Sequence, residues 1–231
     1  MFRIVLAVFC LAVGATAANA QEDELFPDPF PDTVVAKADQ QRPPVLRFRL
    51  GPIQGLLEKT TLGQLQRRLG GRIVRNNGDA SEGEYHLCYF LAAGSAPQVL
   101  RFLSDSEMGG TTHVITGIET QTAAGRPAGC SSPAKQVRAF SMDHGLRIGA
   151  AMAGTAKAFG KPSAATGNPI RGAGDLFYVY GKPLTNADPV FGGTVDRDRA
   201  NGRLCDVADL LRIQARRGRV YGFVASRVTS C

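Results

Sequence analysis

The same order of local signals occurs twice in this chain, and this recurrence restricts the possible folds more than any other feature. In both places a helix-like stretch ends at a glycine, and a glycine just after the last periodic residue is a helix-stop signal. The first stretch covers residues 61–69 and ends at Gly70, and the second covers 150–159 and ends at Gly160. A strand-like run begins 15 residues after each of these glycines. We therefore expect two related units.

Each unit continues with three strand-like segments. The runs at 85–91 and 175–180 are rich in aromatic and branched residues, which is typical of strands. Glycine-containing loops between the apolar runs that come next predict hairpins at 99–118 and 210–228. A helix of nine or ten residues is marginal alone in water and needs a sheet to pack on. The predicted fold class is therefore α+β, with two tandem modules that each pack a short helix on an antiparallel β-meander.

The amino-terminal 20 residues have the three parts of a secretory signal peptide. Arg3 supplies a positive charge, residues 4–13 form an apolar run, and Ala18 and Ala20 form a small-x-small cleavage site. The run is too short to span a bilayer, which needs roughly 20 apolar residues. No second run of spanning length occurs after it. We expect a periplasmic or secreted protein with no transmembrane segment after the signal is cleaved.

Residues 21–44 differ in character from the rest of the chain. They hold five prolines and a net charge of −4, whereas the chain from Val45 onward carries 24 basic and 14 acidic side chains. Such a segment buries little apolar surface, so we expect it to be flexible and extended. The expected domains are a signal peptide at 1–20, this acidic segment, a first module at 45–130 and a second module at 140–231.

Four cysteines remain after removal of the signal, and an even number in an exported chain indicates disulfides, because that compartment is oxidising. Three pairings are possible. We expect Cys88–Cys130 and Cys205–Cys231, since each bridge then closes one half of the chain. No two cysteines are close in sequence and the histidines are scattered, so we expect no metal site.

The start of the second unit resembles a known class of exported modules. Residues 145–149 read Gly-Leu-Arg-Ile-Gly, and the helix-like stretch after them ends in Phe-Gly-Lys-Pro at 159–162. This pattern is similar to the opening of β-lactamase-inhibitor-like modules, a class that includes the small outer-membrane-assembly lipoproteins. The likeness covers 145–162 well and 50–70 loosely. It implies tandem α/β-meander modules that bind another protein through a sheet face, with no catalytic residues to carry over.

We expect no catalytic constellation, and interpret the protein as a non-enzyme without a cofactor. His86 and His113 fall within strand patterns, where a structural histidine is more common than a catalytic base. His144 lies beside Asp143 and near Ser141, but this trio is local in sequence, whereas catalytic triads converge from separate elements. A hydrolase of an envelope polymer that uses His144 stays open as an alternative function.

The predicted function is binding of a protein partner in the bacterial envelope through an open sheet face. Strand side chains alternate between two faces, and we assign the plainly aliphatic ones to the helix-covered core. The residues left for partner binding include tyrosine and arginine, which dominate interface energetics. They are Tyr178, Tyr180, Arg212, Gln214, Tyr221 and Arg227. A one-residue shift inverts the set, so half-buried sheet tyrosines stay an alternative.

A second alternative function is electrostatic binding of an anionic envelope polymer. In an exported protein, an excess of basic side chains favours envelope polymers or an acidic protein as the partner before nucleic acid. This alternative predicts that five arginines form one patch. They are Arg212, Arg216, Arg217, Arg219 and Arg227.

Overall fold

The computed structural model describes residues 46–75, 84–92, 96–105, 113–134, 137–183 and 206–230. Within these ranges the chain contains two α-helices, a short 3-10 helix and antiparallel strands in two sheets. The predicted α+β class is therefore confirmed. No helix in the described ranges is long and apolar enough to cross a membrane.

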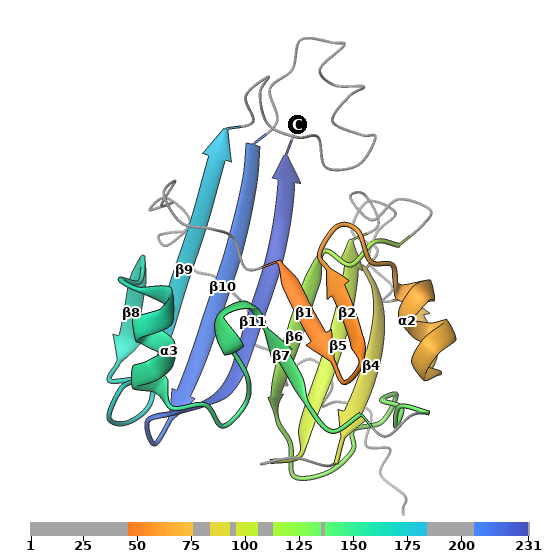
Figure 1. Ribbon diagram of the computed structural model, residues 1–231, viewed down its shortest axis with the longest axis horizontal. Coiled ribbons are helices and arrows are strands. Elements are labelled where there is room, and N and C mark those ends of the chain that lie inside the picture. The colour runs from red at the N-terminus through yellow and green to blue at the C-terminus, as the bar shows by residue number, and fades with distance from the viewer. Residues whose placement is uncertain are drawn as a thin grey trace, which may run out of the picture.

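The larger sheet has eight antiparallel strands in the order β3-β4-β5-β6-β11-β10-β9-β8 (Figure 1). The strands are β3 (Ile73–Arg75), β4 (Glu84–Leu91), β5 (Gln98–Asp105), β6 (Gly117–Thr122), β8 (Ala164–Gly167), β9 (Gly174–Pro183), β10 (Asp206–Arg216) and β11 (Arg219–Ser230). The last strand of each predicted unit lies at the centre, where β6 pairs with β11. The sheet therefore runs without a break across both halves of the chain.

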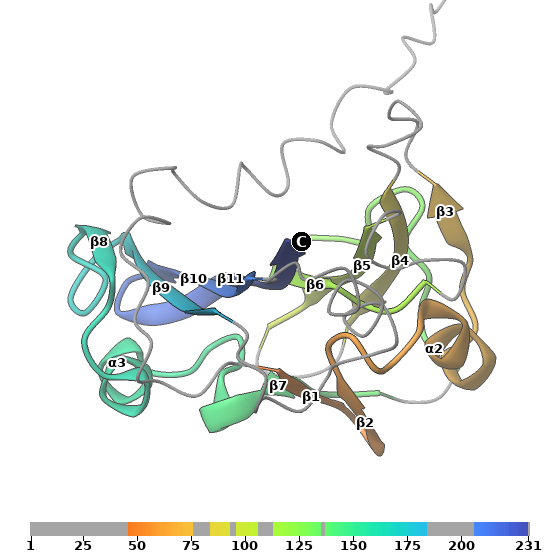
Figure 2. The ribbon, with the colours of Figure 1, turned by 90° about the horizontal axis from the view of Figure 1, so that it is seen from above.

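A second layer covers one face of this sheet (Figure 2). It contains α2 (Leu62–Leu69), a small sheet of order β2-β1-β7, the 3-10 helix η3 (Asp143–Gly145) and α3 (Met152–Phe159). The small sheet consists of β1 (Arg47–Leu50), β2 (Ile53–Leu56) and β7 (Phe140–Met142), with β1 in the middle. We define the outer layer as residues 46–72 and 137–162, which form these elements.

Both helices join the large sheet in the same way. Each ends at a glycine with positive φ, 77° at Gly70 and 74° at Gly160, a conformation that glycine adopts at little cost. Each glycine carbonyl accepts a hydrogen bond from a tyrosine hydroxyl of the long neighbouring strand, from Tyr89 at 2.7 Å and from Tyr178 at 3.4 Å. Helix termination and strand packing are therefore coupled by equivalent contacts in the two halves.

One hydrophobic cluster fills the space between the layers and includes side chains of both halves. Phe140 of β7 lies near its middle, stacked on Phe223 of β11 with ring centroids 5.9 Å apart and edge-on to Phe102 of β5 at 6.2 Å. Large aromatic side chains contribute much of the apolar area that a core buries. The small sheet therefore ties the two halves together, and the division into modules at 45–130 and 140–231 stays a prediction.

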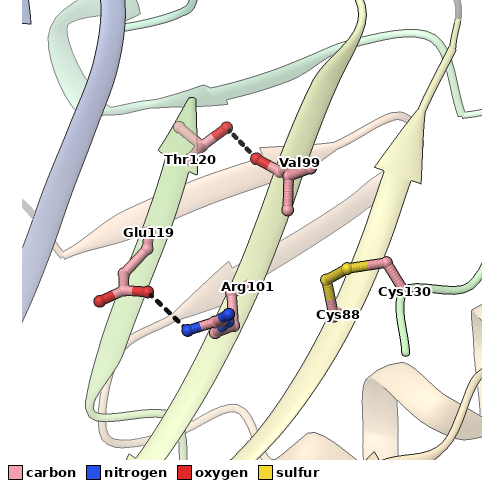
Figure 3. The surroundings of a disulfide bond; sticks show 6 residues. All are labelled: Cys88, Val99, Arg101, Glu119, Thr120 and Cys130. Carbon is pink, nitrogen blue, oxygen red and sulfur yellow. Dashed lines mark hydrogen bonds and ion pairs between the residues drawn. A yellow bond between two sulfur atoms is a disulfide. The ribbon is translucent and has the colours of Figure 1, made fainter. Parts of the chain in front are cut away.

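The disulfide Cys88–Cys130 is present, with the two Cα atoms 4.6 Å apart, which confirms this predicted pairing (Figure 3). It secures the segment after β6 to the edge of β4. Ser131 completes the junction, because its N–H donates to the carbonyl of Cys88 and its carbonyl accepts from the N–H of Phe90. Cys205, Cys231 and residues 1–44 lie outside the described residues, so the predictions for them stay predictions.

Candidate functional site

The predicted open face is wrong for the tyrosines of β9. Tyr178 and Tyr180 belong to the main hydrophobic cluster and are only 1% and 5% exposed. The physical reason is that α3 covers their face of the strand: the Tyr178 ring packs on Phe159 of α3 at 5.4 Å. Phe177 and Val179, which alternate with these tyrosines along the strand, form a separate small cluster on the opposite face. The predicted faces of this strand are therefore inverted.

Gln214 and Arg227 are also buried, at 7% and 4% exposure, so the prediction that they are open to a partner is wrong. The guanidinium of Arg227 donates to both carboxylate oxygens of Asp209, at 2.7 and 3.0 Å, and its Nη1 lies 3.6 Å from Glu58. Burial raises the pKa of Asp209, and the hydrogen bonds and charge of Arg227 oppose that shift. Arg227 therefore belongs to a buried ion pair and is not on an open binding face.

Arg212 and Tyr221 are partly exposed, but they lie in different places. Arg212 is on the face of the large sheet opposite the outer layer, where its Nη2 lies 2.6 Å from the Asp175 carboxylate and its guanidinium is over the Phe177 ring. Tyr221 is at the start of β11, next to Arg216. The six predicted residues therefore do not form one surface.

The predicted patch of five arginines is also divided, because its members lie in different places. Arg212 and Arg227 are held in ion pairs with acidic side chains of the neighbouring strands. The other three, Arg216, Arg217 and Arg219, are exposed at the β10–β11 turn and line one groove. Of the five predicted arginines, the three at this turn lie together.

Most of the excess positive charge lies in the outer layer, a concentration that was not predicted from the sequence. The outer layer carries ten basic and two acidic side chains. All ten basic residues are exposed: Arg47, Arg49, Lys59, Arg67, Arg68, Arg72, Arg138, Arg147, Lys157 and Lys161. The remaining described residues carry ten basic and six acidic side chains, so the charge is concentrated on one side of the molecule.

Both acidic side chains of the outer layer are engaged within the fold. Glu58 lies beside the buried Arg227. The carboxylate of Asp143 accepts hydrogen bonds from the backbone N–H groups of Leu46 and Arg47, at 3.0 and 2.8 Å. Glu58 is therefore offset by the buried arginine, whereas Asp143 is the one carboxylate of the outer layer that lies in the same groove as Arg47 and Arg49.

The alternation of the first strand explains why its arginines face outward. Arg47 and Arg49 are exposed while Phe48 and Leu50, between and after them, are buried in the core. Period-two alternation on a strand with one covered face has this effect. Local sequence therefore fixes two cations at the centre of the exposed face of the small sheet.

Two shallow grooves connect these strand arginines with the helix. One, of about 400 Å³, is lined by Arg47 and Arg49, and the other, of about 350 Å³, is lined by Arg67 and Arg68 of the last turn of α2. Gln54 of β2 lines both grooves. The two grooves therefore meet at Gln54, and we call them together the path across the outer layer; four arginines and Asp143 line it.

The opposite face of the large sheet has a polar row of its own. Glu119 of β6 lies 3.6 Å from Arg101 of β5, and Arg101 is the cross-strand partner of Cys88 (Figure 3). Burial raises the pKa of Glu119 to about 7, against the effect of Arg101. The pKa of His86 is lowered to about 4 by burial and by Arg101. This row is a second place where partly buried charges gather.

The alternative of a hydrolase needs His144 to be hydrogen-bonded to a hydroxyl or carboxylate group, and no such hydrogen bond occurs among the described residues. The His144 ring packs edge-on against Phe159 at 5.0 Å, while the Asp143 carboxylate is used by backbone groups. His113 has a φ of 50° and belongs to a turn instead of the predicted strand, with its ring on Tyr85. In the described ranges, no three His, Cys, Asp or Glu side chains are grouped to hold a metal ion.

No protein-family model matches the chain, and no similar curated protein or solved structure was found.

Proposed function

We propose that this chain is an exported, non-enzymatic binding protein of the bacterial envelope whose outer layer binds an anionic envelope polymer. The observation that carries the proposal is the distribution of charge. The described residues hold 20 basic and eight acidic side chains, and the outer layer has ten of the former but only two of the latter. Both of these carboxylates are engaged within the fold.

The chemistry of the cations supports a polymer of phosphate, carboxylate or sulfate groups. The path across the outer layer is bordered by arginines, whose planar guanidinium groups donate bidentate hydrogen bonds to such oxyanions. The Debye length is about 8 Å at physiological ionic strength, so exposed cations closer together than this act as one field. A polymer that lies along the path meets several cations in succession. We expect affinity to fall steeply as salt is added.

Export is supported by two independent features. The amino-terminal residues have the pattern of a secretory signal, and the Cys88–Cys130 disulfide fits an oxidising compartment. In such a compartment the available polyanions belong to the envelope.

Dextran sulfate tests the proposal, with neutral dextran as the uncharged probe. We expect the protein to bind the sulfated polymer only, and the affinity to fall by more than tenfold between 50 and 300 mM NaCl, because salt screens exposed charges. The variant Arg47→Gln/Arg49→Gln should weaken binding several-fold. Arg75→Gln/Arg126→Gln removes the same charge from exposed positions outside the outer layer and should weaken it less than twofold. Equal losses in the two variants would assign binding to net charge and contradict the proposed surface.

A protein partner on the opposite face of the large sheet is the second candidate function. One observation favours it: all the described helices and the small sheet lie on the other side (Figure 2). The finer interpretation as tandem meander modules belongs with this candidate. It is supported by the equivalent tyrosine-to-glycine hydrogen bonds of the two halves and by the resemblance to β-lactamase-inhibitor-like modules.

The same variants separate the two candidates. A protein retained from an envelope extract by the wild type and by Arg47→Gln/Arg49→Gln, but lost with Arg212→Ala, would favour the sheet face. Loss with the outer-layer variant alone would count against it.

A further inference from the structure

Three arginines at the turn between β10 and β11 line a groove of about 850 Å³. Arg216 and Arg219 are direct cross-strand partners, and Arg217 occupies the turn between them. Like charges directly opposite each other destabilise a strand pair. None of the ion pairs between described residues involves these three side chains. The turn therefore retains an electrostatic cost within the free protein.

The backbone of this turn adds a second cost. Arg217 has a φ of 53° and Gly218 a φ of 68°. Two-residue hairpin turns with positive φ at both positions favour asparagine or aspartate followed by glycine. A long side chain is uncommon at the first position. The presence of arginine there is not explained by the conformation of the turn, whereas a role for its charge would explain it.

The turn is held in place by the elements around it. The N–H of Met152, at the start of α3, donates to the carbonyl of Gly218 at 2.9 Å, and the N–H of Gly218 donates to the carbonyl of Gly172. Arg219 Nη1 donates to the carbonyl of Gly149 at 2.9 Å. Because the backbone is anchored on both sides and the Arg219 side chain is hydrogen-bonded, part of the site is ordered before any ligand arrives, which lowers the entropic cost of binding.

The groove also has an apolar side. Ile148 and Val220 line it and are core residues with exposures of 4% and 1%. Tyr221 lines it as well, with the guanidinium of Arg216 over its ring at 5.6 Å. Because Ile148 and Val220 are almost fully buried, Tyr221 supplies the apolar surface beside the three cations, and this combination matches a ligand that has an anionic end and an apolar body. The volume lies within the range of about 300–1,000 Å³ typical of small-molecule sites.

We propose that this groove binds an anionic amphiphile, with its phosphate or carboxylate group on Arg216, Arg217 and Arg219 and its apolar part along Tyr221. The site is separate from the path bordered by Arg47 and the other arginines of the outer layer, so it does not depend on polymer binding there.

Isothermal titration with dodecyl phosphate below its micellar concentration tests this site. The comparison probes are dodecyl maltoside, which has the same chain without charge, and inorganic phosphate, which has the charge without the chain. We expect dodecyl phosphate to bind at least tenfold more tightly than either. Equal binding of the maltoside would reduce the site to an apolar surface, and equal binding of phosphate would reduce it to a simple anion site. Either result would overturn the proposal.

Variants assign the binding to the turn. Arg216→Gln/Arg219→Gln should lower the affinity for dodecyl phosphate at least tenfold. Arg217→Asn should also weaken binding while the turn is kept or strengthened, because asparagine tolerates positive φ. It therefore remains informative if the double variant is unstable. Arg47→Gln/Arg49→Gln should bind the amphiphile as the wild type does, even if it loses dextran sulfate. Unchanged binding by Arg217→Asn and the double variant would overturn the assignment.

Discussion

Glu119→Gln is expected to remove the loss of stability that the protein undergoes when Glu119 ionises at rising pH. The Glu119 side chain is 12% exposed, and its Oε2 has no hydrogen-bond partner. Burial raises its pKa from 4.5 to about 7; Arg101, 3.6 Å away, lowers the pKa, and Glu84 raises it further. The folded protein therefore holds a proton on this carboxyl group at pH values where the unfolded chain has lost it.

The sign of the effect is set by this difference in pKa. The stabilisation linked to protonated Glu119 is fully present below pH 4.5, the unfolded value, and is lost as the pH rises through about 7. One pKa unit corresponds to about 1.4 kcal/mol, so the whole change is up to about 3 kcal/mol. Glutamine is neutral at every pH and does not incur this loss.

Urea unfolding of the wild type and of Glu119→Gln at pH 5 to 8.5 measures the effect. The free energy of unfolding of the variant, minus that of the wild type, should rise with pH by up to about 3 kcal/mol. Glu84→Gln supplies a check on the cause: without that neighbouring charge the pKa of Glu119 in the folded protein should be lower, so the rise should be smaller and end at lower pH. Parallel stability curves for the wild type and Glu119→Gln would refute the reasoning.

His86 affects the same pH range with the opposite sign. Burial and Arg101 lower its pKa from 6.5 to about 4, so the stabilisation linked to its neutral form is present above pH 6.5 and is lost as the pH falls through about 4. In Glu119→Gln this contribution remains. The variant should therefore gain stability as the pH rises from 4 to 6.5, whereas the two contributions oppose each other in the wild type.

Two further predictions concern the hydrogen bond from Tyr89 to the end of α2 and the disulfide expected between Cys205 and Cys231. Tyr89→Phe removes the hydroxyl that donates to the helix-ending glycine at 2.7 Å, and should lower the free energy of unfolding by about 1 kcal/mol in a chemical denaturation assay. Asp206 and Ser230 are partners in the β10–β11 register, and Cys205 and Cys231 are their next neighbours in sequence, so non-reducing peptide mapping should find these cysteines linked. Their removal should cost on the order of 3–4 kcal/mol; a Cys205 peptide linked elsewhere, or free, would contradict the pairing.

Local signals in the sequence predicted the helices well. The first was expected at 61–69 and spans Leu62–Leu69, with Thr61 as the capping residue and Gln64 completing a capping box. The second was expected at 150–159 and spans Met152–Phe159. Both ends depend on glycine and on nearest neighbours along the chain, which a sequence displays directly.

The faces of the strands could not be predicted in the same way. On β9, large apolar side chains occupy both faces, so Phe177 and Val179 resembled core residues as much as Tyr178 did. The face that the helix covers is decided by tertiary packing. The small sheet was missed because its strands have only three or four residues, and β1 pairs with β7 from a distant part of the chain.

Buried and exposed arginines differ in whether a carboxylate lies beside them, and this difference separates arginines with a structural role from those open to a ligand. On the strands of the large sheet, partly or fully buried arginines lie next to carboxylates: Arg101 with Glu119, Arg212 with Asp175, and Arg227 with Asp209. Burial requires this, because an unpaired charge in a dry environment is costly. Exposed cations have no such requirement, since surface ion pairs contribute little to stability.

Mutual repulsion, however, still disfavours a crowded set of like charges. The outer layer and the β10–β11 turn keep such sets, although the same chain places carboxylates beside the arginines that it buries in the large sheet. Stability alone gives no reason to concentrate exposed arginines at these two places, whereas an anionic ligand would supply balancing negative charge at both.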